Sequence, residues 1–329
     1  MIIMLEGTDG SGKSTLGQQL LDHAQSRDIP SELWHRGVPQ RHPLEEYELD
    51  LEQKYMPGPI PDAMPLAATE LLLVLDRWHL GQLVYGGLYR DANDLGDGGA
   101  WHVNAKLESL GALQLILSPP LELIRERLRT RGEDYLKEEH VEHVRDAYEA
   151  LAVRFARTID VIREPLDDYD VRVLIDAAQA RAQRAQPLAE FKSYVGPLHP
   201  SYLLFGDGAY SAKAGPHNSA FVPYEDTAGR WLCDTLASDC LFGRDADTSV
   251  GIASAMNEDV EKLIDITRPR QIVAMGSIAH NILERHNIQH GTTAHPNVLK
   301  TFAPDDRAAY CEALFIAGDR NTEVNPWRR

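Results

Sequence analysis

The residue types best suited to chemistry occur together near the start of the chain. Residues 7–15 read Gly-Thr-Asp-Gly-Ser-Gly-Lys-Ser-Thr and match G-x-x-x-x-G-K-[ST], the pattern of a phosphate-binding loop. Glycines let such a loop wrap its backbone N–H groups around a phosphate, and the N-terminus of the following helix adds positive potential. The pattern predicts a nucleotide site made by Gly7, Gly10, Ser11, Gly12, Lys13, Ser14 and Thr15.

Two side chains of this loop suit a nucleoside triphosphate and its metal. Lys13 would reach the β- and γ-phosphates, and the Ser14 hydroxyl would ligate Mg²⁺. A glycine-rich turn that matches by chance is the alternative. The surroundings favour the loop, because residues 1–5 form an apolar run of strand length and three leucines follow it at helical spacing. ATP and Mg²⁺ are therefore the expected cofactors.

A charged pair follows the next strongly apolar run. Residues 71–75 are typical of a strand buried on both faces of a parallel sheet, and Asp76 and Arg77 come directly after it. The carboxyl end of such a strand lies beside the phosphate-binding loop. Asp76 is therefore predicted to hold Mg²⁺ or its waters, and Arg77 to bind an acceptor phosphate through two N–H groups. An exposed Asp-Arg pair after a core strand is the alternative.

A cluster of arginines lies further along the chain. Arg125, Arg127, Arg129 and Arg131 fall within seven residues of an otherwise acidic region. In a kinase, this is the place of a lid whose arginines stabilise the transferring phosphoryl group. The alternative is an exposed helix end in which arginines pair with glutamates one turn away.

Apolar runs and turn residues predict the elements that must position these groups. Strands are expected at residues 31–36, 71–75, 113–117 and 171–176, and helices after residue 15, at 80–89, from 120 into the arginine cluster, and at 141–162. A helix and loop over the site are expected at 40–65, and a Gly/Asp loop at 94–99. This alternation is typical of a three-layer α/β/α fold with a parallel sheet.

Residues 1–180 resemble the thymidylate kinase branch of the P-loop nucleoside monophosphate kinases. The matching pieces are residues 6–15, Asp76-Arg77-Trp78 where the family has Asp-Arg-Tyr, and the lid-like stretch 125–134. The resemblance implies a homodimer and the following roles: Asp9 for the acceptor sugar or the metal, Arg77 for the acceptor phosphate, and Arg129 or Arg131 for the phosphates of ATP.

The chain departs from this family where the acceptor would bind. The family has Arg-Glu-Pro-Gly after its second strand, whereas residues 35–39 read His-Arg-Gly-Val-Pro, and residues 78–82 also differ from the family's segment after Asp-Arg. Phosphoryl transfer from ATP is therefore better supported than dTMP as the acceptor.

A second domain is expected, because 329 residues exceed the usual size of a single core. Residues 181–196 are predicted to be a linker between a first domain at 1–180 and a second at 197–329. The second domain has its own α/β pattern. Its expected elements are strands at 202–205 and 271–276, helices at 231–236 and 278–285, and loops at 206–210 and 292–297.

This second pattern resembles the uracil-DNA glycosylase superfamily, which implies a second α/β/α domain. Gly206–Tyr210 loosely matches that superfamily's first motif, residues 295–297 match its His-Pro-Ser loop, and residues 221–232 resemble the segment that follows the first motif. The chemistry needs a group that positions water and a His that stabilises the departing base anion. Asp207 and His295 are the candidates, and DNA is the candidate partner of this domain.

Composition limits what the chain can bind. The formal charge is −17, and residues 1–190 hold 33 of the 50 acidic residues, which disfavours indiscriminate nucleic-acid binding but leaves room for a local basic groove. Three unevenly spaced cysteines suggest neither a disulfide framework nor a zinc site. The pairs His140/His143 and His286/His290 are expected to face solvent.

No apolar run is long enough to cross a membrane, so no membrane partner is expected. Because the expected nucleotide site begins at the N-terminus, no signal peptide is expected before it. A cytoplasmic location is therefore predicted, which would be the cytoplasm of a bacterial host if the chain is viral.

The sequence predicts an ATP- and Mg²⁺-dependent phosphotransferase for a thymidine-type deoxynucleotide, either dTMP or a 5-substituted analogue, joined to a glycosylase-like base-recognition domain. One alternative is a kinase that acts on the 5-hydroxymethyl group of uracil already in DNA, as would suit a bacteriophage that modifies its DNA. Another is a nucleotide-binding sensor without turnover.

Overall fold

The computed structural model describes residues 1–35, 71–89, 95–132, 136–155, 158–191, 193–207, 221, 223, 227–237, 249–256, 258–302 and 305–320. The expectations for residues 36–65 and for Gly208, Ala209 and Tyr210 lie outside this part. The chain forms two compact units, one of residues 1–95 and 110–186, the other of residues 96–109 and 187–329. Residues 96–109 fall within the predicted first domain but group with the second unit. The predicted domain boundaries stay a prediction.

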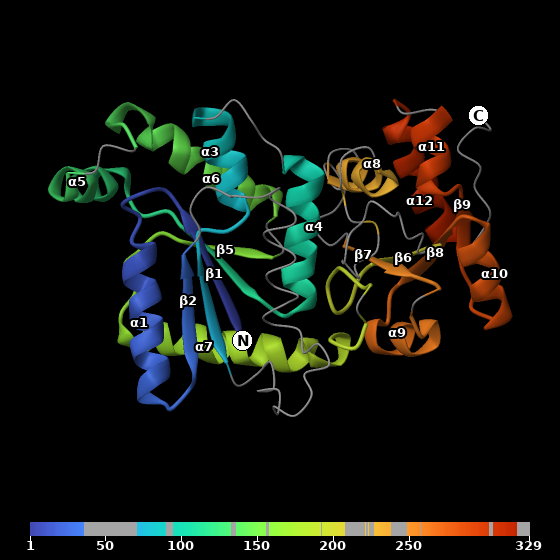
Figure 1. Cartoon of the computed structure of the whole chain (residues 1–329), viewed down its shortest axis with the longest axis horizontal. Coiled ribbons are helices and arrows are strands. Elements are labelled where there is room, and N and C mark those ends of the chain that lie inside the picture. The colour runs from blue at the N-terminus through green and yellow to red at the C-terminus, as the bar shows by residue number, and fades with distance from the viewer. Residues whose placement is uncertain are drawn as a thin grey trace. The chain divides into compact units, whose positions relative to one another are not determined.

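The first unit is built on a parallel sheet of strand order β2-β3-β1-β4-β5 (Figure 1). The three central strands, β1, β3 and β4, are buried along their whole length, as the continuous apolar runs predicted. The strands are β1 Ile2–Gly7, β2 Ser31–His35, β3 Leu72–Asp76, β4 Leu113–Leu117 and β5 Ile159–Ile162.

Helices cover both faces of this sheet and complete the three layers. Helices α1 and α7 bury their apolar faces against β1, β3 and β4 in one core, while α3 and α6 pack on each other and on β1. The α/β fold with parallel strands is thus as predicted. The helices are α1 Lys13–Ser26, α3 Leu80–Tyr89, α5 Leu121–Arg131, α6 Val141–Arg154 and α7 Asp168–Ala185.

Two predicted elements of this unit are wrong. The helix expected at 141–162 ends at Arg154, and its last residues form β5. The strand expected at 171–176 lies inside α7, where a capping box fixes the helix start: Asp167 accepts from the Asp170 N–H at 2.9 Å, and Asp170 accepts from the Asp167 N–H at 3.0 Å. The buried residues of α7 recur at helical spacing, so packing agrees with the cap.

The second unit has its own parallel sheet, of strand order β7-β6-β8-β9. The strands expected near 202–205 and 271–276 are confirmed, whereas β7 was not predicted. The strands are β6 Tyr202–Gly206, β7 Val250–Ser254, β8 Gln271–Met275 and β9 Gly291–Thr293. The helices are α4 Gly96–Ser109, α8 Ala228–Thr235, α9 Val260–Thr267, α10 Ser277–Arg285, α11 Pro296–Phe302 and α12 Arg307–Arg320.

The Gly/Asp loop expected at 94–99 is wrong from Gly96 onward, because these glycines begin α4. The Gly98 N–H donates to Asp234 Oδ1 of α8 at 3.0 Å, and a Cβ at Gly98 would lie only 2.3 Å from that oxygen. The glycine therefore permits a close approach of α4 to α8 rather than a turn.

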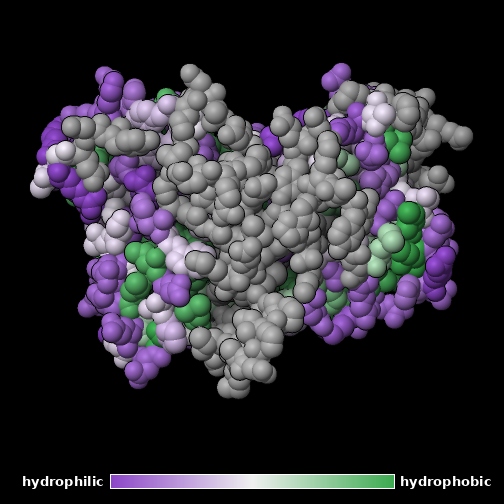
Figure 2. All heavy atoms as spheres, viewed as in Figure 1, coloured by the Kyte–Doolittle hydropathy of each residue, from purple (hydrophilic) through white to green (hydrophobic). Residues whose placement is uncertain are grey.

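The surface of the described residues is mixed. On the face shown in Figure 2, most of the coloured surface is hydrophilic, and a few smaller hydrophobic areas lie within it. No helix in the described part has both the length and the apolar character needed to cross a membrane. Cys233 is a buried thiol that donates to the carbonyl oxygen of Phe221 at 3.6 Å, whereas Cys311 takes part in a disulfide bond that the cysteine spacing did not predict.

Candidate active site

The predicted phosphate-binding loop joins β1 to α1, and its glycines meet real steric demands. Gly7 has φ 138°, and a Cβ there would lie 2.4 Å from the carbonyl oxygen of Leu117 in β4. Gly12 has φ 102° and is the N-cap of α1, where no side chain caps the helix. The first backbone N–H groups of α1 are thus left for a ligand, as an anion site at a helix N-terminus requires.

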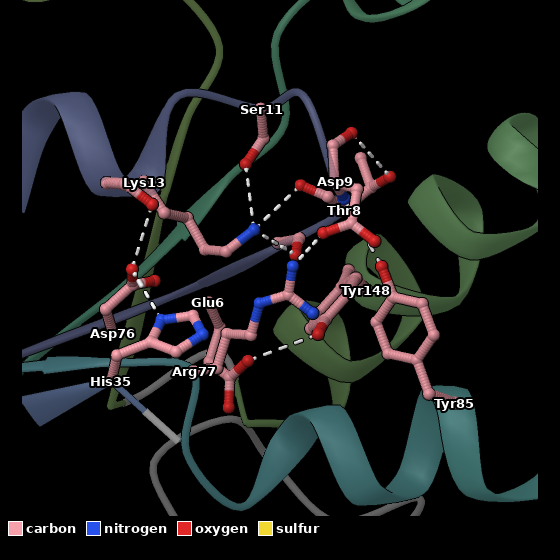
Figure 3. A network of polar contacts seen from close by, with 12 residues as sticks. Glu6, Thr8, Asp9, Ser11, Lys13, His35, Asp76, Arg77, Tyr85 and Tyr148 are labelled. Atoms are coloured by element: carbon pink, nitrogen blue, oxygen red, sulfur yellow. Dashed lines mark hydrogen bonds and ion pairs between the residues drawn. The ribbon is translucent and has the colours of Figure 1, made fainter. Parts of the chain in front are cut away.

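Lys13 lies inside the loop. Its Nζ donates to the carbonyl oxygens of Gly7 at 2.7 Å and Thr8 at 2.8 Å, and it lies 3.4 Å from Ser11 Oγ (Figure 3). Burial lowers the pKa of this ammonium to about 8, with Arg77 acting in the same direction and nearby carboxylates opposing both. A phosphate in the loop would place a negative charge beside the ammonium and so stabilise its charged form, which burial disfavours.

Ser14 and Asp76 are brought together at the adjacent ends of α1 and β3. The Ser14 hydroxyl donates to Asp76 Oδ2 at 3.0 Å, and His35 Nδ1 lies 3.1 Å from the same oxygen. Asp76 is 1% exposed. A hydroxyl beside a buried carboxylate offers hard oxygen ligands of the kind that Mg²⁺ prefers. The metal role that the sequence predicted for Ser14 and Asp76 stays a prediction.

Asp9 and Arg77 form a second charged pair beside the loop. The Arg77 guanidinium donates to Asp9 Oδ1, and its carbon lies 6.0 Å from the centre of the Tyr85 ring (Figure 3). The Tyr85 hydroxyl in turn accepts from the Asp9 N–H at 3.3 Å. Arg77 has φ 63°, although it is not a glycine. The left-handed backbone at Arg77 lets the side chains of Asp76 and Arg77 point in different directions.

Glu6 directly precedes the loop, and the sequence analysis gave it no role. From inside β1, its Oε1 accepts from the backbone N–H groups of Trp78 at 2.9 Å, Leu80 at 3.0 Å and Gly81 at 3.2 Å, and its Oε2 accepts from the Tyr148 hydroxyl at 3.2 Å. Burial raises the pKa of this carboxyl, while these donors and Lys13 oppose the rise. Glu6 thus holds the segment after Arg77 and the start of α3. In the sequence, the sign of this role is that Glu6 is the single acidic residue of an otherwise apolar strand.

His79 predicts a pH dependence of stability. This imidazole is fully buried, has no hydrogen-bond partner among the described residues, and burial lowers its pKa to about 3. Below pH ~6.5, His79 is protonated in the unfolded chain but stays neutral in the folded chain. The free energy of unfolding should therefore fall by up to ~1.4 kcal/mol per pH unit on acidification. Urea unfolding at pH 7 and pH 5 measures this difference.

His79→Leu should show a smaller loss between those two pH values than the wild-type chain. His143→Leu is the matched control, because His143 is exposed on α6 of the same unit. An equal loss in the His79 and His143 variants would contradict the assignment.

Three of the four arginines of α5 divide into two kinds of contact. Arg127 Nη1 donates to the carbonyl oxygens of Gly10 and Ser11, both at 3.1 Å. Arg125 pairs with Glu122 at 3.1 Å, and exposed Arg129 pairs with Glu138. The exposed-pair interpretation therefore fits Arg125 and Arg129, whereas Arg127 contacts the loop itself.

A pocket of about 470 Å³ opens between the phosphate-binding loop, α5 and the segment after β5. Its walls combine loop backbone with apolar side chains and two arginines. Among the lining residues are Gly10, Gly12, Thr15, Leu117, Pro119, Arg127, Arg131, Pro165 and Leu166. This volume lies within the range of small-molecule sites.

Arg127 and Arg129 should therefore differ in their effect on nucleotide binding. Arg127→Ala should weaken ATP binding by roughly tenfold, since it removes charge-assisted hydrogen bonds that shape the loop. Arg129→Ala is the matched control on the same helix and should change the dissociation constant little, because an exposed pair contributes only slightly. Calorimetric titration with ATP measures both. The reverse order would favour the phosphate role that the resemblance implies for Arg129.

In the second unit, Asp207 and His295 lie close together around Gly276. A Cβ at Gly276 would lie 3.1 Å from both Asp207 Oδ2 and His295 Cβ. Asp207 Oδ1 accepts from the Ala279 N–H at 2.9 Å, and the His295 ring lies 5.6 Å from the ring of Phe221. The sequence predicted a shared site for Asp207 and His295, and their roles there remain a prediction.

The state of His295 follows from its contacts. The Asn297 N–H donates to His295 Nδ1 at 3.1 Å, so the neutral ring carries its proton on Nε2, which is buried without a partner among the described residues. Burial lowers the pKa of His295, and Asp207 opposes this. A neutral N–H donor is the kind of group that binds an anionic or carbonyl oxygen of a ligand.

Two of the histidines expected to face solvent do not. His290 is buried and its Nε2 lies 2.9 Å from His280 Nδ1. His140 is half-buried, with its Nδ1 3.0 Å from the Tyr89 hydroxyl. Local spacing missed both contacts because each partner lies at least ten residues away.

No protein-family model matches the chain, and no curated protein matches its sequence. Among solved structures, the YorR protein from Bacillus subtilis, in complex with phosphorylated GDP, aligns over 56% of this chain and 98% of its own, with 16% identity and a TM-score of 0.40. The structure of deoxyadenosine kinase from M. mycoides with bound dCTP aligns over 55% of this chain and 100% of its own, with 16% identity and a TM-score of 0.32. The structure of the same kinase with bound dATP aligns over 54% of this chain and 97% of its own, with 17% identity and a TM-score of 0.34.

Proposed function

We propose that the first unit transfers the γ-phosphoryl group of ATP, with Mg²⁺, to a pyrimidine deoxynucleotide. The observation that carries this proposal is the meeting of three groups at the carboxyl ends of β1 and β3. These groups are Lys13 in its loop, the Ser14–Asp76 pair, and the Asp9–Arg77 pair. Binding, metal and acceptor chemistry would then share one sheet edge, as phosphoryl transfer requires.

The donor side follows from the loop and the pocket beside it. The phosphates of ATP would lie on the backbone N–H groups of residues 10–15, with Lys13 turning from the loop carbonyls to the β- and γ-phosphates. The base and ribose would occupy the pocket next to Arg127, against apolar residues such as Leu117 and Pro119. Ser14 and Asp76 would hold Mg²⁺, which would supply positive charge to offset the phosphates during transfer.

The acceptor side follows from the second charged pair. Arg77 would bind the acceptor's phosphate through its guanidinium fork, which now pairs with Asp9. Asp9 would then be free to contact the sugar or a metal-bound water. Glu6 supports this geometry because it holds the segment after Arg77 by three backbone hydrogen bonds.

Two acceptors are consistent with these groups. The first is a free thymidine-type nucleotide, dTMP or a 5-substituted dUMP. The second is the 5-hydroxymethyl group of uracil in DNA, with the second unit, which holds Asp207 and His295, recognising DNA. A sensor that binds ATP without turnover is the third candidate.

Transfer of radiolabelled γ-phosphate from ATP distinguishes the three candidates. The intact chain is incubated in parallel with dTMP, 5-hydroxymethyl-dUMP and duplex DNA containing 5-hydroxymethyluracil. Label on a free monophosphate alone supports a nucleotide kinase, and label in DNA supports a DNA-modifying enzyme. Tight ATP binding without a labelled product would sink the transferase proposal and support the sensor.

A further inference from the structure

A set of metal-ligating side chains lies in the second unit and includes neither Asp207 nor His295. Within the described part of the chain, His280, Glu284 and His290 offer ligand atoms that all lie within 4.8 Å of one another. His280 and Glu284 are four residues apart on α10, so they share one helix face. His290 comes directly before β9.

The hydrogen bonds of His290 fix its tautomer. Its Nδ1 lies 2.6 Å from the carbonyl oxygen of Ile288, which can only accept, so Nδ1 carries the proton. Nε2 of the neutral ring therefore carries no proton and can accept a hydrogen bond or bind a metal. It lies 2.9 Å from His280 Nδ1. A backbone carbonyl that holds the far N–H of an imidazole is the arrangement that orients a metal-binding histidine.

The geometry suits an ion between the two rings. Two Zn–N bonds of about 2.0–2.1 Å at a tetrahedral angle separate their nitrogens by roughly 3.3 Å, so the rings need to part by only a few tenths of an ångström. His290 is buried and Glu284 is exposed, so the set is closed on the protein side and open to solvent on the other. Water could supply a fourth ligand.

We propose that His280, Glu284 and His290 bind one divalent transition-metal ion of the zinc class. Two imidazole nitrogens and one carboxylate oxygen match the preferences of Zn²⁺ and do not match those of Mg²⁺ or Ca²⁺. On binding, the proton of His280 moves from Nδ1 to Nε2 through solvent, and Nδ1 becomes a ligand.

The ion would tie α10 to the start of β9. Helix α10 carries Ala279, whose N–H holds Asp207, and β9 leads within five residues of His290 to His295. The metal would thus fix two elements that position the Asp207–His295 site. It is a positioning ion, and the proposal does not depend on the kinase function of the first unit.

Zinc titration of the intact chain tests the proposal. The chain is stripped with a chelator, the chelator is removed, and Zn²⁺ is added in competition with a chromogenic zinc indicator, with Mg²⁺ in large excess to fill the phosphate-binding loop's metal site. The wild-type chain should take up one equivalent. His290→Ala should weaken this binding by more than the about 10–100-fold that loss of an outer partner causes.

Two further variants keep the test decisive. Glu284→Ala changes an exposed side chain, so it should fold normally and still weaken zinc binding even if His290→Ala fails to fold. His286→Ala is the matched control, because His286 lies next to the same helix end but pairs with Glu261 at 2.9 Å. Its zinc affinity should equal that of the wild-type chain.

Cobalt provides a second readout of the same ion site. Co²⁺ in place of Zn²⁺ should give visible ligand-field absorption in the wild-type and His286→Ala chains, and not in Glu284→Ala or His290→Ala. Zinc uptake that is absent, or equal in the wild-type and Glu284→Ala chains, overturns the proposal and leaves a plain His–His hydrogen bond.

Discussion

Lys13→Ala is expected to lower the rate of phosphoryl transfer by roughly 10²–10³-fold, since one charge contact to the transition state contributes about 3–4 kcal/mol. The buried ammonium lies among the loop carbonyls, 2.7 Å from Gly7 O, and no other lysine of the described residues takes part in this loop. Initial rates at saturating ATP, with the acceptor that takes up label, measure the change.

Two controls separate charge from packing and from protein quality. Lys13→Met keeps much of the buried stem and should lose as much rate as Lys13→Ala, because the charge is what acts. Lys137→Ala changes an exposed lysine of the same unit and should keep the wild-type rate. Near-full activity in both Lys13 variants would place catalysis somewhere other than the loop.

Glu6→Ala is expected to lower the free energy of unfolding by about 3 kcal/mol, because it leaves three backbone N–H groups and a buried hydroxyl without their acceptor. The same change should reduce the transfer rate, since Glu6 fixes the segment that follows Arg77. Urea denaturation measures the first effect and the labelled-phosphate assay the second.

Tyr148→Phe is the graded control for Glu6. It removes one donor of the four and should cost about 1 kcal/mol, with little change in the transfer rate. If Glu6→Ala were no more harmful than Tyr148→Phe, the backbone hydrogen bonds of Glu6 would not hold the site.

The fold could be predicted where a strand is buried on both faces. Residues 71–75 and 113–117 are unbroken apolar runs because β3 and β4 lie in the middle of the sheet. β5 is short and at the edge, and only its first residue is buried, so its four residues carry little signal. Residues 171–176 have the composition of a strand, but the cap formed by Asp167 and Asp170 decides for a helix.

The candidate site could be predicted only where its residues are contiguous. The loop is a local motif, and Asp76 and Arg77 follow a recognisable strand. The contacts of Glu6 and Arg127 join residues more than seventy positions apart, and the bond between His280 and His290 depends on how α10 and β9 pack. Such partnerships are set by tertiary structure, which no local spacing reveals.

The grouping of α4 with the second unit has a consequence for how the chain is made and divided. The ribosome completes Gly96–Ser109 almost eighty residues before it begins the rest of that unit at Pro187. Helix α4 is therefore synthesised well before α8, the helix against which it packs. The strands of the first unit must pair although the residues of α4 interrupt that unit in the sequence. A single cut at residue 186 would divide the second unit's own helices, so the two halves of this chain are not exchangeable modules joined end to end.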